Sequence, residues 1–420
     1  MTLELSTNDR AMLAGEGGEA SRIAMGVIVE MAEVSGASRL IDVTSAHIDG
    51  GLYHGRAGLD WAAKLLHAGA RVVVPTTLNV SSLDLLHPNL YRGDPDIALQ
   101  ARRLMDSYVA MGCSPSWTCA PYLLPNRPAF GEQIAWAESN AIVFVNSVIG
   151  ARTERYGDFI DICAATTGRV PDAGLHRSEH RWGQVLFTLN GVPRRLMEQD
   201  AFFPVLGHLV GAAAGTRVPV IDGLQRASED QLKALGAAAA SSGAVALFHA
   251  VGITPEAPTL DDAFGGRSPE ETVDVTAKAI VRARDSLTTF RGQEISGVSL
   301  GTPHFSIAEF AALLPLIEDV RIHPAIEFYV STNRFVLAEI ERRGWAETYT
   351  AAGIQIVVDT CTYITPILRR TRGAVMTNSA KWAYYAPGNI GVDVVFGSTA
   401  ECVRSAAGGR VWRDESLWGF

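Results

Sequence analysis

The hydrophobic positions of the N-terminal part of the chain alternate between a helical period and short apolar runs. Apolar residues recur at spacings of three and one between Ala20 and Met31, which predicts an amphipathic helix. Residues 7–9 predict an earlier helix start, because short polar side chains accept hydrogen bonds from the first amides of a helix. Residues 40–43 and 72–74 predict buried strands, with a helical pattern at 59–66 between them. This alternation is typical of an α/β architecture.

A more regular pattern begins near residue 295. Short apolar runs predict strands at 298–300, 326–330, 354–358, 374–376 and 394–396. Ser306 and Asn333 follow the first two runs and predict helix starts. Four or five such units predict a doubly wound parallel sheet, in which ligands gather beyond the carboxyl ends of the strands.

A chain of 420 residues is long for one hydrophobic core, so we expect several packed α/β/α units with mainly parallel sheets. We predict an N-terminal α/β region at 1–215, a helical and connecting region at 216–290, and the doubly wound region at 291–420. The first boundary depends on a glycine-containing seam at 211–215. Residues 253–266 are rich in Pro, Gly and Asp and predict a long connection or an active-site flap.

Composition and charge narrow the class of function. The net charge of −9 argues against a nucleic-acid partner, which needs concentrated Lys and Arg, and against anionic membranes. The N-terminus lacks the basic start and apolar run of a signal peptide, and no run reaches the roughly 18 apolar residues of a membrane span. The five cysteines are sparse and odd in number, so we expect no disulfide framework and a cytoplasmic location.

Polar residues cluster at five predicted strand ends. The clusters contain His47; Thr76, Thr77 and Asn79; Asn146 and Ser147; Asp359, Thr360 and Cys361; and Thr377, Asn378 and Ser379. Each cluster alone is typical of a turn or a helix cap. Five clusters at the same kind of position favour a ligand site.

Three cysteines stand beside small or polar residues near predicted strand ends. Cys119, Cys163 and Cys361 are well separated and none belongs to a CxxC pair, which argues against a structural zinc ribbon. Three thiolates can hold an iron–sulfur cluster and leave one iron open to substrate. Spacing alone leaves a role in packing open for them, and Cys113 and Cys402 are typical of packed thiols at helical positions.

The densest run of chemically active residues spans 136–181. Arg152 and Arg169 suit a substrate carboxylate, because a guanidinium donates two parallel hydrogen bonds; a surface salt bridge is the alternative for each. Glu138 is a candidate acid–base group, or else a charge on a helix face. His176 is a candidate general acid, or else a satisfied turn residue.

Other enzyme signatures are missing from the sequence or lack the required context. Ser379 and Lys381 show Ser-x-Lys spacing rather than the Ser-x-x-Lys of serine acyl-enzymes, and no Gly-x-Ser-x-Gly elbow occurs. Residues 15–20 match the dinucleotide pattern Gly-x-Gly-x-x-Gly/Ala, but a predicted helix precedes them instead of a strand. No Gly-Lys-Ser/Thr run occurs, so nucleotide hydrolysis is unsupported.

Ordered motifs along nearly the whole chain resemble one family. They are Met12-Leu13-Ala14-Gly15-Glu16-Gly17, Ala46-His47-Ile48, Pro75-Thr76-Thr77-Leu78-Asn79, Thr118-Cys119-Ala120-Pro121-Tyr122, Ala137-Glu138-Ser139-Asn140-Ala141, Asn146-Ser147-Val148, Gly150-Ala151-Arg152-Thr153, Gly174-Leu175-His176, Pro303-His304-Phe305-Ser306, Asp359-Thr360-Cys361 and Thr377-Asn378-Ser379-Ala380-Lys381. Together they resemble aconitase X, the divergent branch of the aconitase superfamily. The match is specific, because so many ordered motifs do not recur by chance.

The resemblance implies an aconitase-like fold and an iron–sulfur cluster of the 2Fe–2S or 4Fe–4S type. It also implies a hydro-lyase that dehydrates a hydroxylated acid. Bacterial members include cis-3-hydroxy-L-proline dehydratases, whose product is 1-pyrroline-2-carboxylate, and archaeal members include a mevalonate 5-phosphate dehydratase, which is the alternative here. Some members divide into two subunits, so the resemblance implies a large subunit that pairs with a small swivel-domain subunit in a heterodimer. Two positions depart from the family pattern, Glu154 after Arg152-Thr153 and Thr302 before Pro303.

The resemblance and the residue chemistry together imply roles for individual residues. Cys119, Cys163 and Cys361 are expected to hold the cluster. The catalytic candidates are Ser379, Lys381, Glu138 and His176, and the substrate-binding candidates are His47, Thr76, Thr77, Asn79, Ser139, Asn140, Asn146, Ser147, Arg152 and Asn378. We expect the base to be a serine of the small subunit, with Ser379 and Glu138 as alternatives.

Two rival functions stay open at this point. A phosphorylated substrate would require an additional Lys/Arg cluster for a dianion, and the sequence shows no compact one. A non-catalytic cluster-holding scaffold or sensor is the rival of another class. The intact polar motifs at 138–181 and 377–381 argue against that second rival.

Overall fold

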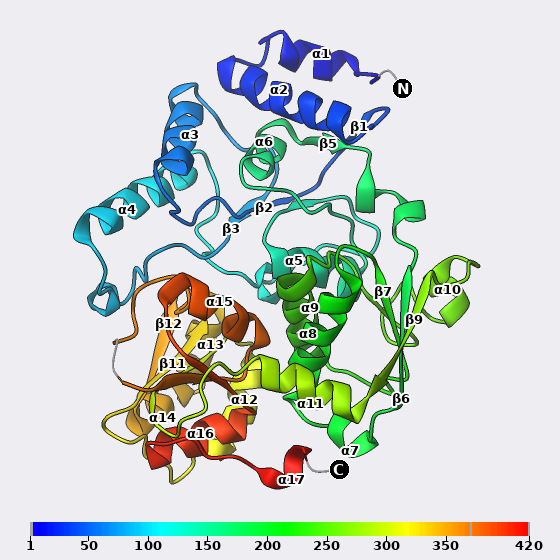
Figure 1. The fold of residues 1–420 in the computed structure, drawn as a ribbon. Coiled ribbons are helices and arrows are strands. Elements are labelled where there is room, and N and C mark those ends of the chain that lie inside the picture. The colour runs from blue at the N-terminus through cyan, green and yellow to red at the C-terminus, as the bar shows by residue number, and fades with distance from the viewer. Residues whose placement is uncertain (1–2, 370–371, 419–420) are drawn as a thin grey trace. The chain divides into compact units, whose positions relative to one another are not determined.

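The computed structural model describes residues 3–369 and 372–418, and strands occur in both the N-terminal and the C-terminal parts of the chain. Contacts divide the chain into two units. Unit 1 comprises residues 1–83 and 94–182, and unit 2 comprises residues 84–93 and 183–420. Figure 1 follows the chain through these units from blue to red.

Unit 1 is built on two small sheets. Strands β3 (Thr76–Leu78), β2 (Ala46–Ile48) and β4 (Ala135–Trp136) form a parallel sheet in that order. Strands β1 (Leu40–Asp42) and β5 (Arg169–Pro171) pair antiparallel. The helices are α1 (Thr7–Leu13), α2 (Glu19–Val34), α3 (Arg56–His67), α4 (Pro95–Ala110), α5 (Ser139–Phe144), α6 (Ile160–Thr167), the π-helix η3 (Val145–Ile149) and the short 3₁₀ turns η2 (Pro121–Leu123), η4 (Gly174–His176) and η5 (Ser178–His180).

Unit 2 contains two parallel sheets. The first has the order β8-β7-β6-β9, from β6 (Val185–Gly191), β7 (Pro219–Asp222), β8 (His249–Ala250) and β9 (Glu271–Thr276). Its helices are α7 (Arg194–Met197), α8 (Phe202–Ala214), α9 (Glu229–Gly243), α10 (Leu260–Phe264) and α11 (Ala277–Ser286). Unit 2 also includes the 3₁₀ turn η1 (Pro88–Leu90).

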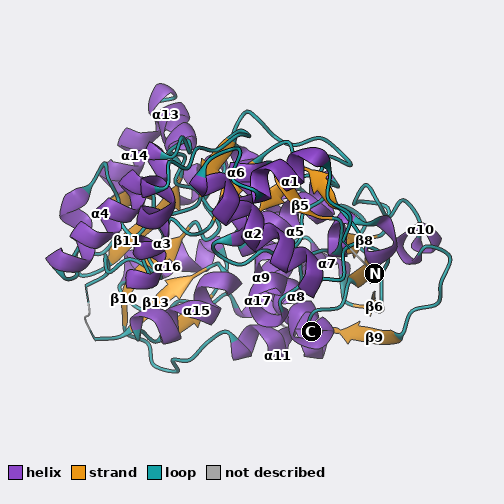
Figure 2. Cartoon of the chain, turned by 90° about the horizontal axis from the view of Figure 1, so that it is seen from above, coloured by secondary structure: helices purple, strands orange, loops and turns teal. Residues whose placement is uncertain are grey.

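The second sheet of unit 2 has the order β12-β11-β10-β13-β14. Its strands are β10 (Ile295–Leu300), β11 (Glu327–Thr332), β12 (Ile354–Val358), β13 (Ala374–Thr377) and β14 (Val394–Phe396). Its helices are α12 (Ile307–Ile317), α13 (Arg334–Arg342), α14 (Trp345–Ala352), α15 (Ala380–Ile390), α16 (Thr399–Gly408) and α17 (Glu415–Trp418). β10 and β13 lie side by side (Figure 2), and the strand order reverses between them, which is where ligands bind in sheets of this kind.

Several helices begin where the sequence supplies a capping side chain. Ser306 accepts from the amide of Glu309, whose side chain accepts in return from the Ser306 amide, so a capping box opens α12. Asn333 caps α13 in the same sense. The strands between these helices are buried, and one apolar core that includes Val298, Phe310 and Val330 packs the helices onto the sheet.

Many predicted elements are confirmed. The helix starting near residue 7 is α1, the helix between Ala20 and Met31 lies within α2, and the pattern at 59–66 lies within α3. All five strands predicted after residue 295 are present and parallel, with both predicted caps. The Gly-x-Gly-x-x-Gly/Ala match lies between two helices, α1 and α2, so its rejection as a dinucleotide motif is confirmed.

Three local predictions were wrong. The strand expected at 72–74 instead lies at Thr76–Leu78, so residues of the polar cluster themselves form the strand. The seam expected at 211–215 falls mainly inside α8, because its glycines allow α8 to approach α9. A parallel sheet therefore spans the expected boundary at residue 215, and residues 216–290 contain strands as well as helices. Within 253–266 the chain forms α10.

Candidate active site

Polar groups of unit 1 gather beyond the carboxyl ends of its parallel sheet. Asp49 follows β2, Asn79 follows β3, and Glu138 stands two residues after β4. The amide of Thr118 donates to the carbonyl of Leu78 at 3.1 Å, which brings the loop of Cys119 to the end of β3. This edge is the position at which parallel sheets bind ligands.

Two carboxyl groups at this edge have raised pKa values. Burial raises the pKa of Asp49 to about 8, and the charges of Glu138, Asp158 and Asp161 add to the effect. Burial also raises the pKa of Asp161 to about 7, although its carboxylate accepts from the Asp49 amide at 2.7 Å. Such values suit proton transfer near neutral pH. The sequence analysis missed Asp49, although its place directly after the Ala46-His47-Ile48 motif was a usable signal.

His47 is buried within β2 and is neutral near pH 7. Burial lowers its pKa to about 4, against the opposing charge of Glu138. Its Nδ1 shares a hydrogen bond with Oγ1 of Thr77 at 2.8 Å, whereas Oγ1 of Thr76 donates to the carbonyl of Val74. Asn79 donates from Nδ2 to the Asp49 carboxyl group. His47 and Thr77 therefore lie within the paired strands β2 and β3, so their expected place at strand ends was wrong, whereas Asn79 follows the end of β3.

Glu138 is a buried helix cap rather than a charge on a helix face. Its carboxylate accepts from the amide of Ala141 at 2.7 Å and from Oγ of Ser139 at 3.1 Å. Asn140 donates from Nδ2 to the carbonyl of Cys119 at 2.8 Å. The motif around Glu138 therefore holds the main chain of Cys119.

Asn146 and Ser147 lie in the π-helix η3, so their expected place at a strand end was wrong. Asn146 donates to the carbonyl of Thr153 at 3.0 Å and accepts from the amide of Thr153 at 3.1 Å. Ser147 is buried. Arg152 donates to the carbonyl of His176 at 3.1 Å. These contacts link η3 to the chain that follows it, and π-helices are frequent at functional sites.

His176 and Arg169 both contact other side chains of this chain. The ring of His176 is 2.6 Å from Oε1 of Gln133 and 2.5 Å from the hydroxyl of Tyr156, and burial lowers its pKa to about 4. Arg169 pairs with Asp9 at 2.9 Å and also with Asp42, which confirms the salt-bridge alternative for this residue.

The five cysteines are buried, but their surroundings differ. Cys163 lies on α6 instead of at a strand end, and burial raises the pKa of its thiol. Burial also raises the pKa of Cys113, to about 12, and that of Cys402 on α16. Raised thiol pKa values disfavour the thiolate that binds metals. Cys119 is instead in the loop at the edge of the unit 1 sheet.

Unit 2 supplies a pair of metal-binding groups. Cys361 follows the end of β12, as expected, and its Sγ lies within 4.8 Å of a ring nitrogen of the buried His304. Nε2 of His304 lies 3.3 Å from the carbonyl of Thr360. Thiolate and imidazole both bind iron and iron–sulfur clusters, so this donor pair fits the expected group. His304 belongs to a motif recognised in the sequence, but its place beside Cys361 was not predicted.

The C-terminal candidates lie at the reversal of strand order in unit 2. Ser379 caps α15, accepts from the amide of Trp382 at 3.0 Å, and donates to the carbonyl of Thr302. Asn378 donates to Oγ1 of Thr399 at 3.0 Å. Lys381 is buried in the first turn of α15. Of these three residues, Ser379 contacts residue 302, which follows β10.

Across the two described stretches of the chain, none of the helices has both the length and the apolar character needed to cross a membrane.

Comparison with known proteins covers nearly the whole chain. Family models named aconitase X first domain, second domain and third domain match residues 2–179, 183–285 and 295–408, respectively. The chain is similar to solved Thermococcus kodakaraensis aconitase X in its holo-form, with a TM-score of 0.87 and 30% identity. That match covers 96% of this chain and 100% of the solved chain.

Three relatives carry enzyme names. The cis-3-hydroxy-L-proline dehydratase of Pseudomonas aeruginosa is 45% identical over 97% of this chain and 70% of its own length. The enzyme of the same name from Hypocrea jecorina is 41% identical over 100% of this chain and 71% of its own length. The phosphomevalonate dehydratase large subunit of Methanothermobacter thermautotrophicus is 34% identical over 95% of this chain and 98% of its own length.

Proposed function

Since this chain belongs to the aconitase X family, we propose that it is the large subunit of a hydro-lyase that converts cis-3-hydroxy-L-proline to 1-pyrroline-2-carboxylate. The observation that carries the proposal is the identity of 45% and 41%, over nearly the whole chain, to two enzymes named for this substrate. Identity to a phosphomevalonate dehydratase large subunit is lower, at 34%.

The proposed reaction is a β-elimination. A base takes the proton from C2, the electron pair of that bond forms the C2–C3 double bond, and the hydroxyl leaves C3 and departs as water after gaining a proton. The enamine then tautomerises to the cyclic imine. Because the C2 proton is weakly acidic, negative charge that grows toward the carboxylate must be stabilised. Arg152 and Lys381 are the groups that we assign to the carboxylate.

We assign the base first to a serine of a partner subunit, with Glu138 and Ser379 as alternatives. The hydroxyl of Ser379 caps α15 and donates to Thr302, which supports a positioning role. Asp49 is a candidate for the acid that protonates the leaving hydroxyl, because its pKa of about 8 lets it hold a proton near neutral pH. His47, Thr77 and Asn79 are proposed to orient the substrate at the same edge.

The proposed metal ligands are Cys361 and His304 of unit 2 together with Cys119 and Cys163 of unit 1. The support for the first two is their proximity, and the support for Cys119 is its place at the edge of the unit 1 sheet. Cys163 has the weakest support, because it lies on α6 and not at a strand end. An iron–sulfur cluster, when bound, supplies a Lewis acid for the leaving hydroxyl.

A small swivel-domain subunit is the proposed partner. The chain spans 98% of a relative named as a large subunit but 70% of the Pseudomonas aeruginosa dehydratase. The name of the former relative supports the proposal of a small-subunit partner. We propose that the two subunits form a heterodimer and that it is located in the cytoplasm.

The test of function is an anaerobic assay of the chain co-expressed with a small subunit of this family. We expect water loss from cis-3-hydroxy-L-proline by the complex and little turnover by the large subunit alone. Turnover of mevalonate 5-phosphate instead would favour the second substrate. A pure, iron-loaded complex that acts on neither compound would favour a scaffold or sensor.

The test of the metal site is the iron content of single variants purified without oxygen. C119S, C361S and H304Q are each expected to lower iron content and visible absorbance, because each removes a proposed ligand. C402S and C113S are matched controls with buried thiols and should retain iron. The result for C163S decides whether the fourth proposed ligand is a ligand or a packed thiol. Unchanged iron in C361S and H304Q would overturn the site in unit 2.

A further inference from the structure

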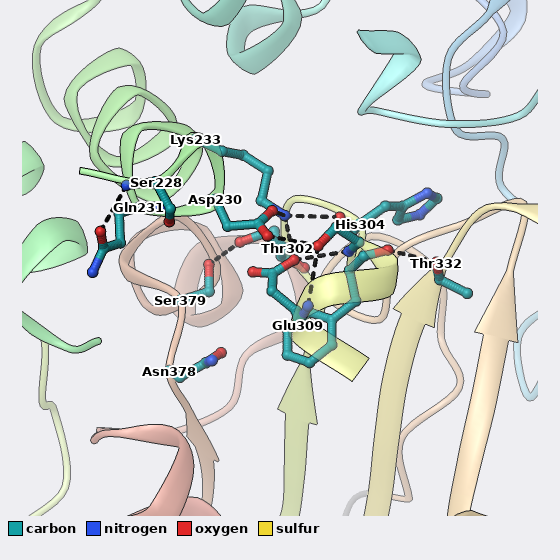
Figure 3. A network of polar contacts seen from close by, with 12 residues as sticks. Ser228, Asp230, Gln231, Lys233, Thr302, His304, Glu309, Thr332, Asn378 and Ser379 are labelled. Carbon is teal, nitrogen blue, oxygen red and sulfur yellow. Dashed lines mark hydrogen bonds and ion pairs between the residues drawn. The ribbon is translucent and has the colours of Figure 1, made fainter. Parts of the chain in front are cut away.

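The segment that leads from β10 into α12 is held through its main-chain carbonyl groups. The carbonyl of Thr302 accepts from the hydroxyl of Ser379, and that of Phe305 accepts from Oγ1 of Thr332 at 2.8 Å. The carbonyl of His304, between them, accepts from Nζ of Lys233 at 3.3 Å. Figure 3 shows these donors converging on the segment from three different elements.

Lys233 reaches His304 from α9, 71 residues earlier in the chain. Its side chain is 1% exposed and pairs with Asp230 at 2.9 Å and with Glu309. An ammonium group carries three donors. Two carboxylates and the His304 carbonyl therefore account for its donor capacity, which fixes the direction of the side chain.

Both carboxylates also hold the residue that caps α12. Glu309 accepts from the amide of Ser306 at 2.8 Å, and Asp230 accepts from its hydroxyl at 2.7 Å. His304 is thus restrained at its own carbonyl and two residues farther along. On its other side, the imidazole lies 3.3 Å from the carbonyl of Thr360, next to Cys361.

From this geometry we propose that Lys233 is a positioning residue, which sets the direction of the His304 imidazole for metal binding. The inference rests on the proposed function, in which His304 is a ligand. Groups that orient a metal-bound histidine change metal affinity by roughly ten- to a hundred-fold when they are removed. Lys233 differs from the usual partner of this kind, because it acts on the main chain of His304 and not on its ring.

A purely structural role is the alternative. Removing Lys233 alone would leave the carboxylates of Asp230 and Glu309 without their partner, which lowers stability even when an apolar side chain of similar size replaces the packing. An apolar side chain cannot donate to the His304 carbonyl. The two roles therefore predict different results for a substitution that preserves packing and removes the donor.

The test compares K233M with K278M, which removes an exposed lysine of α11. Both variants are co-expressed with the proposed partner, purified without oxygen and titrated with an iron chelator. We expect K233M to release iron at roughly ten-fold lower chelator concentration or more and to show an altered electron paramagnetic resonance spectrum of the reduced cluster. K278M should match the parent protein in both measurements.

D230N provides a milder variant if K233M fails to fold, because Lys233 keeps Glu309 and the His304 carbonyl. We expect a smaller change of the same sign in iron release and in the spectrum. The positioning role is overturned if a folded K233M has the iron affinity and the spectrum of the parent. If K233M does not fold, the same result in D230N overturns it. H304Q separates the two proposals. If H304Q retains iron, the assignment of His304 as a ligand fails. If H304Q loses iron but K233M has the iron affinity of the parent, only the positioning role of Lys233 fails.

Discussion

Arg181 donates to Asn146 twice: Nη1 lies 3.0 Å from the side-chain oxygen of Asn146 and Nη2 lies 3.0 Å from its main-chain carbonyl. The same guanidinium donates to the carbonyl groups of Leu175 and Ala151, at 3.0 and 3.3 Å. The residue is 2% exposed. Arg181 therefore joins the π-helix η3 to the 3₁₀ turn η4, and the side chain of Asn146 accepts a hydrogen bond from it.

Replacing Arg181 by Met should lower the free energy of unfolding by about 3 kcal/mol, because the carbonyl groups that it satisfies would remain buried. R177M is the control, since Arg177 forms an exposed pair with Glu179 and should change stability by less than about 1 kcal/mol. Urea denaturation followed by fluorescence measures both. Equal stability of R181M and R177M would contradict the role of Arg181.

His176 should make the protein less stable in mild acid. Burial, followed by the charge of Arg181, lowers its folded-state pKa to about 4 from an ordinary value of 6.5. Between pH 4 and pH 6.5 the unfolded state therefore binds one more proton than the folded state. The contribution of His176 to the free energy of unfolding is present above pH 6.5 and is lost as pH falls toward 4. The loss is on the order of 3 kcal/mol.

The measurement is urea denaturation of the parent, H176Q and H180Q at intervals between pH 7 and pH 4. H176Q should show a shallower fall in stability over this window, because its side chain does not titrate. H180Q changes an exposed histidine and should follow the parent. A parent-like slope in H176Q would show that His176 does not contribute to acid sensitivity.

The contact between α8 and α9 depends on glycine. A Cβ atom added at Gly207 would lie 2.1 Å from the carbonyl oxygen of Leu235, so G207A should lower the free energy of unfolding by about 2 kcal/mol or more. G26A is the control within helix α2, where an added Cβ meets no atom within 4 Å. It should be neutral or stabilising by up to about 1 kcal/mol. Thermal denaturation distinguishes these opposite signs.

Arg334 supports the turn that carries Cys361. Its Nε and Nη2 donate to the Asp359 carboxylate at 2.7 and 2.6 Å, and the Asp359 side chain is 0% exposed. R334M would leave a buried carboxylate without this partner and should cost about 2 kcal/mol, below the value for a fully buried pair because Arg334 is partly exposed.

R334M should also lower iron content, because Asp359 stands two residues before Cys361. R342M on the same helix, α13, is the control for both measurements, since Arg342 pairs with Glu339 at an exposed surface. If R334M and R342M have the same iron content and the same free energy of unfolding, Arg334 does not support the turn that carries Cys361.

The predictability of the fold differs between the two units for a physical reason. The strands β11 and β12 are buried along most of their length and contain apolar runs that are visible in the sequence. The strands β2 and β3 have three residues each, and both contain polar side chains that belong to the candidate site. Such short strands carry no periodicity of their own, which is why the strand was expected at 72–74 instead of at Thr76–Leu78.

The candidate site was predictable in its motifs but not in its contacts. The motif around Glu138 indicated a polar centre, yet its function as a buried cap depends on the amide of Ala141 in three dimensions. Asn146 was expected to bind substrate because an amide side chain can form hydrogen bonds with it. Arg181, which determines where Asn146 points, lies 35 residues away and has no recognisable motif.

The sequence alone determined the parallel C-terminal sheet, its helix caps at Ser306 and Asn333, and the family resemblance, because local periodicity, capping and ordered motifs are properties of neighbouring residues. Only the tertiary structure decided that His304 lies within 4.8 Å of Cys361 and that Lys233 donates to the carbonyl of His304. Those contacts join residues 57 and 71 positions apart (361 − 304 and 304 − 233). Contacts at such separation follow from how strands and helices pack, which no local pattern specifies.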